Sequence, residues 1–273
     1  MIESILVGTD GSEAAASAER FAISLAARLR ARIAACTVVE DRDVRAPDDG
    51  GLGTPGFPDA ALATYYRARA EATARRFGER AREGGVQGGC EMQQGVAADA
   101  LVARARSASL CALGRRGKGD YAGAALLGST VDAVLRTTSR SVVVVPPGAP
   151  TRGAIVLGFD GSPGSRLAAQ VAVDLANGLG EAVHVFVDSK DKGRAVARFD
   201  EVRELVGGLS VPVREASSTL GRPDVKIVDT ATEAAAGLIV MGAYGRNRIT
   251  ECFIGSNAAA VARTSPVAVL LVR

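Results

Sequence analysis

The chain has 273 residues, of which 47% are hydrophobic and 23% charged, a composition typical of folded globular proteins and unlike that of disordered chains. Its 33 basic and 30 acidic residues nearly balance and form no long basic block, which argues against nucleic acid as the main partner. No stretch has the ~20 apolar residues of a membrane span or the pattern of a secretory signal, so we expect no membrane association and a cytoplasmic location.

Short runs typical of β-strands alternate with longer runs typical of helices along the whole chain. The strand-type runs are residues 4–10, 32–39, 89–95, 109–114 and 141–147, followed by 154–160, 182–188, 211–217, 237–242 and 267–272. Such alternation predicts an α/β fold, in which right-handed crossovers build doubly wound parallel sheets with helices on both faces.

The second half of the chain repeats the first. Asp160 follows Asp10 by 150 residues, whereas Gly242 follows Gly114 by 128, so about 22 residues are missing from the second copy. The breaker-rich segment 41–59 has no counterpart there, and we expect it to form a surface loop or lid. Proline and glycine cluster in "PPGAPTRG", which predicts a linker between domains at 1–147 and 152–273.

Each half contains a glycine loop between a strand-type run and a helix-type run. "GRRGKGDYAGAALLGS" (114–129) and "GAYGRNRITECFIGS" (242–256) both open with two glycines three residues apart and end in Gly-Ser. In an open parallel sheet the loops meet the ends of the first strands, "VGTDGS" and "LGFDGS", in one crevice. Bare backbone and a helix N-terminus suit phosphate, whereas Asp10 and Asp160 suit ribose hydroxyls or a base edge. Turn and N-cap chemistry explains one such loop equally well, but two copies favour a binding site.

Common catalytic motifs are missing from the sequence. No GxxxxGK[ST] and no strict GxGxxG after a first strand are present. The single histidine, His184, lies in the apolar run "AVHVFVD" of one half, which excludes a Ser-His-Asp triad or a two-histidine metal site in each half and predicts a structural role. Four cysteines without CxxC spacing predict reduced, packed thiols, with Cys252 set apart by its place in the second loop.

The motifs "ILVGTDGSE", "LLGSTVDAVLRTTSRSVVVVP", "LIVMGAYGRN" and GxxG, nine residues, G[ST] closely resemble the universal stress protein family over essentially the whole chain, as two tandem domains. The resemblance implies a Rossmann-like, adenine nucleotide alpha hydrolase-like fold with a five-stranded parallel sheet in each domain. It also implies an adenine nucleotide as partner, with ATP as the ligand and Mg²⁺ held through the phosphates. The nucleotide-binding residues implied for the first domain are Thr9, Asp10, Val39, Gly114, Gly117, Gly128, Ser129 and Thr130. Those implied for the second are Asp160, Val187, Gly242, Gly245, Gly255, Ser256 and Asn257.

The two copies differ in ways that bear on binding. The second loop keeps nine residues between its glycine pairs and the first has ten, which predicts a weaker phosphate grip in the first half. Phe159 stands where the first half has Thr9, and it either crowds a nucleoside or packs in the core. We expect both halves to bind, with one working and one degenerate site as the alternative. Five loop cations either approach a polyphosphate or are simply solvated: Arg115, Arg116, Lys118, Arg246 and Arg248.

The expected function is that of an ATP-binding regulatory module of the stress response, with no catalytic residues and at most weak ATP hydrolysis. A slow ATPase and a nucleotide-independent dimerising scaffold are the alternatives. The family also pairs domains through the last strand, and "SVVVVP" and "VAVLLVR" are apolar enough to do so. We therefore expect an intramolecular pseudo-dimer through these strands and a homodimer of whole chains.

Overall fold

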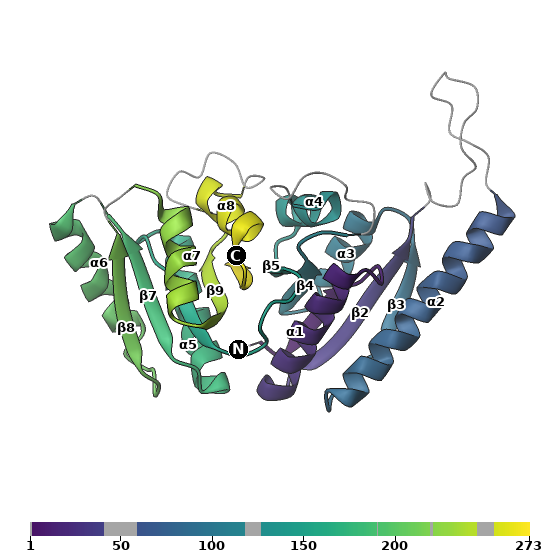
Figure 1. The fold of residues 1–273 in the computed structure, drawn as a ribbon, viewed down its shortest axis with the longest axis horizontal. Coiled ribbons are helices and arrows are strands. Elements are labelled where there is room, and N and C mark those ends of the chain that lie inside the picture. The colour runs from purple at the N-terminus through teal and green to yellow at the C-terminus, as the bar shows by residue number, and fades with distance from the viewer. Residues whose placement is uncertain (1, 41–58, 118–126, 190, 219–220, 245–253) are drawn as a thin grey trace, which may run out of the picture.

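The computed structural model describes residues 2–40, 59–117, 127–189, 191–218, 221–244 and 254–273, in which strands and helices alternate (Figure 1). The first half contains β1 (Ser4–Gly8), α1 (Glu13–Leu29), β2 (Arg32–Val39), α2 (Ala60–Glu83), β3 (Cys90–Gln94), α3 (Ala97–Ala105), β4 (Leu110–Gly114), α4 (Ser129–Thr137) and β5 (Ser141–Val145). The second half contains β6 (Ala154–Gly158), α5 (Pro163–Leu179), β7 (Val183–Asp188), α6 (Lys192–Leu205), β8 (Val213–Ser218), α7 (Pro223–Glu233), β9 (Ala236–Gly242), α8 (Ser256–Thr264) and β10 (Ala268–Val272). Each strand-type run of the sequence is a strand, whereas nearly all of the expected surface loop, 41–58, lies outside the described residues.

The strands form one ten-stranded sheet in the order β3-β2-β1-β4-β5-β10-β9-β6-β7-β8. Within each half all pairings are parallel, and the strand order reverses between the first and fourth strands. The halves join where β5 and β10 pair antiparallel, with Val144 opposite Val269. Two doubly wound parallel sheets of five strands are thus continuous through their last strands, and the fold class expected from the sequence is confirmed.

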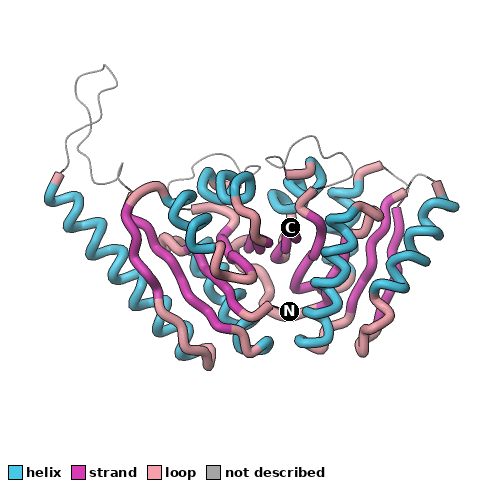
Figure 2. Tube along the Cα trace, turned by 180° about the vertical axis from the view of Figure 1, so that it is seen from behind, coloured by secondary structure: helices cyan, strands magenta, loops and turns pink. Residues whose placement is uncertain are grey.

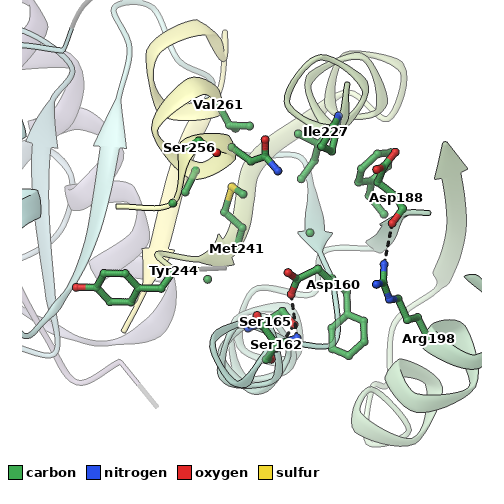
Figure 3. Close-up of a pocket in the computed structure, with 18 residues that line it drawn as sticks. Asp160, Ser162, Ser165, Asp188, Arg198, Ile227, Met241, Tyr244, Ser256 and Val261 are labelled. Atoms are coloured by element: carbon green, nitrogen blue, oxygen red, sulfur yellow. Dashed lines mark hydrogen bonds between the residues drawn. The ribbon is translucent and has the colours of Figure 1, made fainter. Parts of the chain in front are cut away.

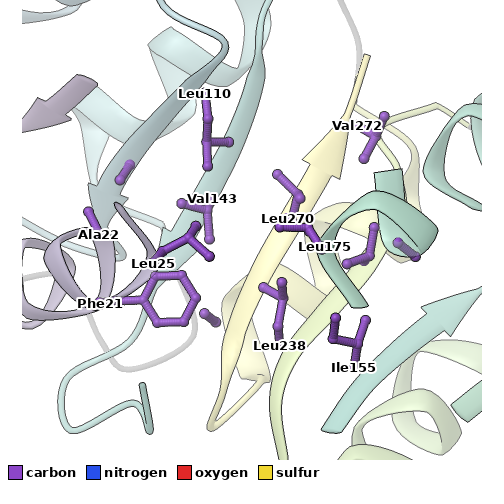
Figure 4. Close-up of a cluster of buried hydrophobic side chains, with 14 of the residues drawn as sticks. Phe21, Ala22, Leu25, Leu110, Val143, Ile155, Leu175, Leu238, Leu270 and Val272 are labelled. Atoms are coloured by element: carbon purple, nitrogen blue, oxygen red, sulfur yellow. The ribbon is translucent and has the colours of Figure 1, made fainter. Parts of the chain in front are cut away.

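Helices cover both faces of the sheet and create two cores (Figure 2). One face packs against α1, α2, α5 and α6, and the other against α3, α4, α7 and α8. On the first face Phe21 and Leu25 of α1 point toward Val143 of β5 (Figure 4). Because both cores contain residues from each half, apolar burial holds the halves together as well as the elements within them.

Arginines reinforce the junction between the halves. Arg28 of α1 donates to the Leu179 carbonyl at 2.8 Å and to the Glu181 carboxylate at 2.5 Å, both in the second half. Arg115 donates to the Ser265 carbonyl at the end of α8 at 2.8 Å, and Arg273 donates to the Thr138 carbonyl at the end of α4 at 2.5 Å. Each half therefore satisfies the exposed carbonyls at a helix end of the other, where partial negative charge favours a cation.

Two further expectations concern single features of the fold. His184 lies within β7, opposite Val156 of β6 and Arg214 of β8, and burial together with Arg214 lowers its pKa. No helix among the residues described combines the length and the apolar character needed to span a membrane.

Candidate functional site

The turn after the first strand of each half is built by an Asp-Gly-Ser sequence. The Oδ1 atoms of Asp10 and Asp160 accept from the backbone N–H groups of Ser12 and Ser162, both at 2.9 Å. Each serine then caps the following helix, since its Oγ accepts from the N–H three residues on. The intervening glycines have φ of +74° and +76°, a backbone conformation that glycine adopts without strain. The sequence thus fixes both aspartates at the carboxyl edge of the sheet.

The first glycine of each loop allows a helix to approach the end of a strand. A Cβ on Gly114, at the end of β4, would lie 2.6 Å from the carbonyl oxygen of Ala14 in α1. A Cβ on Gly242, at the end of β9, would lie 2.7 Å from the carbonyl carbon of Gly164 in α5. Both distances are too short for any side chain, so these glycines bring the aspartate turn and the glycine loop together.

Both glycine loops are closed at their base by the same hydrogen bond. Gly128 N–H donates to the Arg115 carbonyl at 3.0 Å, and Gly255 N–H donates to the Ala243 carbonyl at 2.9 Å. These are equivalent positions, so the extra residue of the first loop does not change how the loop closes. Residues 118–126 of the first loop lie outside the described residues. So do residues 245–253 of the second loop, which include Gly245.

A pocket of about 410 Å³ opens at the carboxyl ends of β1, β2 and β4. Its lining contains every nucleotide-binding residue expected in the first half, namely Thr9, Asp10, Val39, Gly114, Gly117, Gly128, Ser129 and Thr130. Arg116 and Glu40 add charge, and Tyr66 and Leu101 add apolar surface. The pocket lies where the strand order reverses, the position at which open α/β sheets bind ligands.

A second pocket, of about 540 Å³, occupies the corresponding place in the second half (Figure 3). Five of the expected residues line it: Asp160, Gly242, Gly255, Ser256 and Asn257. Figure 3 shows Ser256 on one side, at the start of α8, and Asp188 with Arg198 on the opposite side. Both pockets therefore combine a helix N-terminus, a carboxylate after the first strand and an apolar wall.

The universal stress protein family matches this sequence twice, over residues 1–146 and 151–273. The chain belongs to the universal stress protein family. A universal stress protein of Mycolicibacterium smegmatis is 32% identical over 67% of this chain and 68% of its own length. One from Mycobacterium tuberculosis H37Rv is also 32% identical, and the alignment covers 64% of it, so the chain spans less than two thirds of that relative.

The solved structure of a family member shows the same fold over nearly the whole chain. A universal stress protein from Archaeoglobus fulgidus superposes with a TM-score of 0.78 at 20% identity, and the match covers 99% of this chain and 98% of that one. A universal stress protein in complex with cAMP matches 54% of this chain and 99% of its own, at 24% identity and a TM-score of 0.41. The tandem arrangement of two universal stress protein domains thus accounts for the ten-stranded sheet.

One residue expected in the second pocket of this family member does not line it. Val187 is fully buried in the core, and its neighbours Phe186 and Asp188 line the pocket. Strand register explains the difference: Gly8 pairs with Cys36 and Gly158 with Phe186, so Val187 corresponds to Thr37 and not to Val39. The sequence comparison matched Val39 to Val187, whereas the strand register puts the counterpart of Val39 two residues further along the chain.

Phe159 packs in the core and also borders the second pocket, so both roles considered from the sequence, packing and crowding a nucleoside, are compatible with its position. It is 2% exposed. Its counterpart Thr9 donates to Glu19 at 2.5 Å, and Arg80 of α2 forms an ion pair with the other oxygen of this buried carboxylate. Sequence reasoning missed this polar cluster because its partners are 61 residues apart.

The loop cations have different roles. Arg115 turns away to the Ser265 carbonyl, and burial together with Arg116 lowers its pKa. Arg116 lines the first-half pocket. Lys118, Arg246 and Arg248 lie outside the described residues.

The described cysteines are free thiols, and we expect two of them to resist alkylation in the folded protein. Burial raises the pKa of Cys36 to about 11 and that of Cys111 to about 12, so neither supplies an appreciable amount of thiolate at pH 8. Iodoacetamide treatment followed by peptide mass spectrometry should leave both unmodified, and both should react in 8 M urea. Rapid labelling of Cys36 in the folded protein would show that the pocket it lines opens to solvent.

Proposed function

We propose that the chain is a regulatory module of the stress response that binds ATP, with the first-half pocket as a binding site. The observation that carries the proposal is the convergence of all eight expected residues on that one pocket at the strand-order reversal. The second-half pocket occupies the corresponding place and repeats several of these features.

The pocket has distinct ends that match the parts of a nucleotide. At one end Gly128 precedes α4, whose first N–H groups and partial positive charge favour phosphate, and the Ser129 hydroxyl and Arg116 reinforce this. Asp10 repels phosphate but accepts hydrogen bonds from ribose hydroxyls. Val38, Val39 and Leu101 offer an apolar surface to the base.

A divalent cation fits this arrangement only through the ligand. Among the described residues no group of three or more His, Cys, Asp or Glu side chains is placed to hold a metal ion. Mg²⁺ would therefore bind through the phosphates of ATP, and it would reduce their charge repulsion. Nucleotide binding would then shift the population of conformations of the loops next to the pocket. Dimerisation of whole chains stays a prediction.

The proposal predicts that Asp10→Asn weakens ATP binding about ten-fold. The amide keeps an oxygen for the Ser12 N–H, so the turn should survive, but the charge-assisted hydrogen bond to ribose is lost. Isothermal titration of ATP with Mg²⁺ into the full chain gives the affinity. Glu13→Gln is the matched control, because it makes the same change of charge on an exposed side chain three residues away. Failure of the unaltered chain to bind ATP, or equal affinities of the chain and Asp10→Asn, would refute the assignment.

A further inference from the structure

The second-half pocket has a buried arginine at a position where the first-half pocket has none, although Arg69 and Arg116 line the first-half pocket elsewhere. Arg198 of α6 lines the second-half pocket and is only 8% exposed. Its Nη1 donates to the Asp188 carbonyl at 2.8 Å, and in the described part of the chain this is the one hydrogen bond that its guanidinium makes. A buried guanidinium has five N–H donors, so donors remain for a ligand in the pocket that it borders.

The position of Arg198 suits a base better than a phosphate. Ser256 and the N-terminus of α8, where phosphate is favoured, lie on the opposite side of the pocket (Figure 3). Asp160 and Asp188 are carboxylates that also line this pocket, and Figure 3 shows Asp188 beside Arg198. A polyphosphate is repelled by carboxylates, whereas a neutral base with both acceptors and donors on its edge is not.

The first-half pocket has uncharged side chains at the same two places. Gly11 lies against Thr73 and Arg76 of α2. Gly161 lies in the same way against Arg198 and Glu201 of α6, so Thr73 is the counterpart of Arg198.

The counterpart of Asp188 follows from strand register. Cys36 and Phe186 occupy the same position opposite the first strand, which makes Val38 the counterpart of Asp188. The first-half pocket thus has threonine and valine where the second has arginine and aspartate.

We propose that the second-half pocket selects a 6-oxopurine nucleotide, such as a guanine nucleotide, while the first-half pocket takes adenine. The inference rests on the nucleotide-binding function proposed above. Guanine presents the acceptors O6 and N7 to an arginine and the donors N1–H and N2–H to a carboxylate. Adenine has an amino group in place of O6, which would set donor against donor at Arg198. One chain would then sense two classes of purine nucleotide.

The test is native mass spectrometry of the full chain with equimolar ATP and GTP and excess Mg²⁺. We expect the main doubly loaded species to contain one ATP and one GTP, with GTP favoured at least about ten-fold at the second-half pocket. The double variant Asp188→Val with Arg198→Thr copies the first-half pocket and should load two ATP. Arg194→Thr, an exposed arginine on the same helix, should behave as the unaltered chain.

Folding of each variant is checked by thermal unfolding. If the double variant does not fold, Arg198→Lys serves instead, because it keeps the charge but removes the planar fork of donors, and it should lose most of the preference for GTP. An unaltered chain that carries two ATP, or a folded variant that keeps one ATP and one GTP, overturns this inference and leaves ATP binding standing. A chain that binds neither nucleotide overturns both proposals.

Discussion

Arg80→Ala is expected to lower the free energy of unfolding by about 3 kcal/mol. Arg80 forms an ion pair with Glu19, whose side chain is 1% exposed, and Thr9 donates to the other carboxylate oxygen at 2.5 Å. Removal of the arginine leaves the carboxylate buried without its counter-charge, which costs far more than the pair contributes when intact. Urea unfolding followed by circular dichroism gives the difference in free energy.

Arg75→Ala is the control for this experiment, since it removes an exposed arginine from the same helix and should change stability by less than about 0.5 kcal/mol. A loss of stability at Arg80 no larger than that of the control would show that water reaches the Glu19 carboxylate.

The second half shows an apolar solution to the same packing problem. The counterparts of Thr9, Glu19 and Arg80 are Phe159, Ala169 and Leu205, all of which belong to the hydrophobic core or pack against it. Well-packed apolar groups can replace a buried ion pair with little loss. The polar cluster therefore belongs to the first half's aspartate turn and is not a requirement of the fold, since Thr9 Oγ1 also accepts from Gly11 N–H at 3.3 Å.

The fold was predictable from the sequence because its signals are local and occur twice. Apolar runs such as 141–145 are buried on both faces, as expected of parallel strands, and the repeat placed equivalent strands in each half. The aspartate turns and most of the glycine-loop positions were also predictable, since Asp-Gly-Ser and Gly-Ser have fixed roles before helices.

The residues that the sequence did not predict depend on contacts between distant elements. Val187 was misplaced because only the pairing of β6 with β7 fixes which residue of β7 reaches the pocket. An acidic residue in a helix, such as Glu19, is usually solvated, and only the packing of α2, which brings Arg80 to Glu19, shows that this one is paired. Arg198 lies in a helix with little apolar periodicity, and its burial follows from the packing of α6 beside β7. Of these three residues, Arg198 lines a pocket and distinguishes it from the other.

Gly114→Ala is expected to lower the free energy of unfolding by about 2 kcal/mol and to weaken ATP binding as well. The added Cβ would lie 2.6 Å from Ala14 O and 2.7 Å from Ala14 C, which are backbone atoms in the first turn of α1. No rotamer change relieves such a contact, so α1 must move, and overpacking of this kind costs about 1–3 kcal/mol. Because Ser12 caps α1 and binds Asp10, the shift also displaces the aspartate that faces the pocket.

Gly89→Ala is the matched control for Gly114→Ala, since a Cβ at Gly89 meets no atom within 4 Å and its φ is not positive. Urea unfolding and isothermal titration with ATP should find this variant close to the unaltered chain. Normal stability of Gly114→Ala with loss of ATP binding would mean that the glycine serves the ligand directly and not the approach of α1. The expected result, a joint loss, instead makes the glycine a packing residue on which the geometry of the pocket depends.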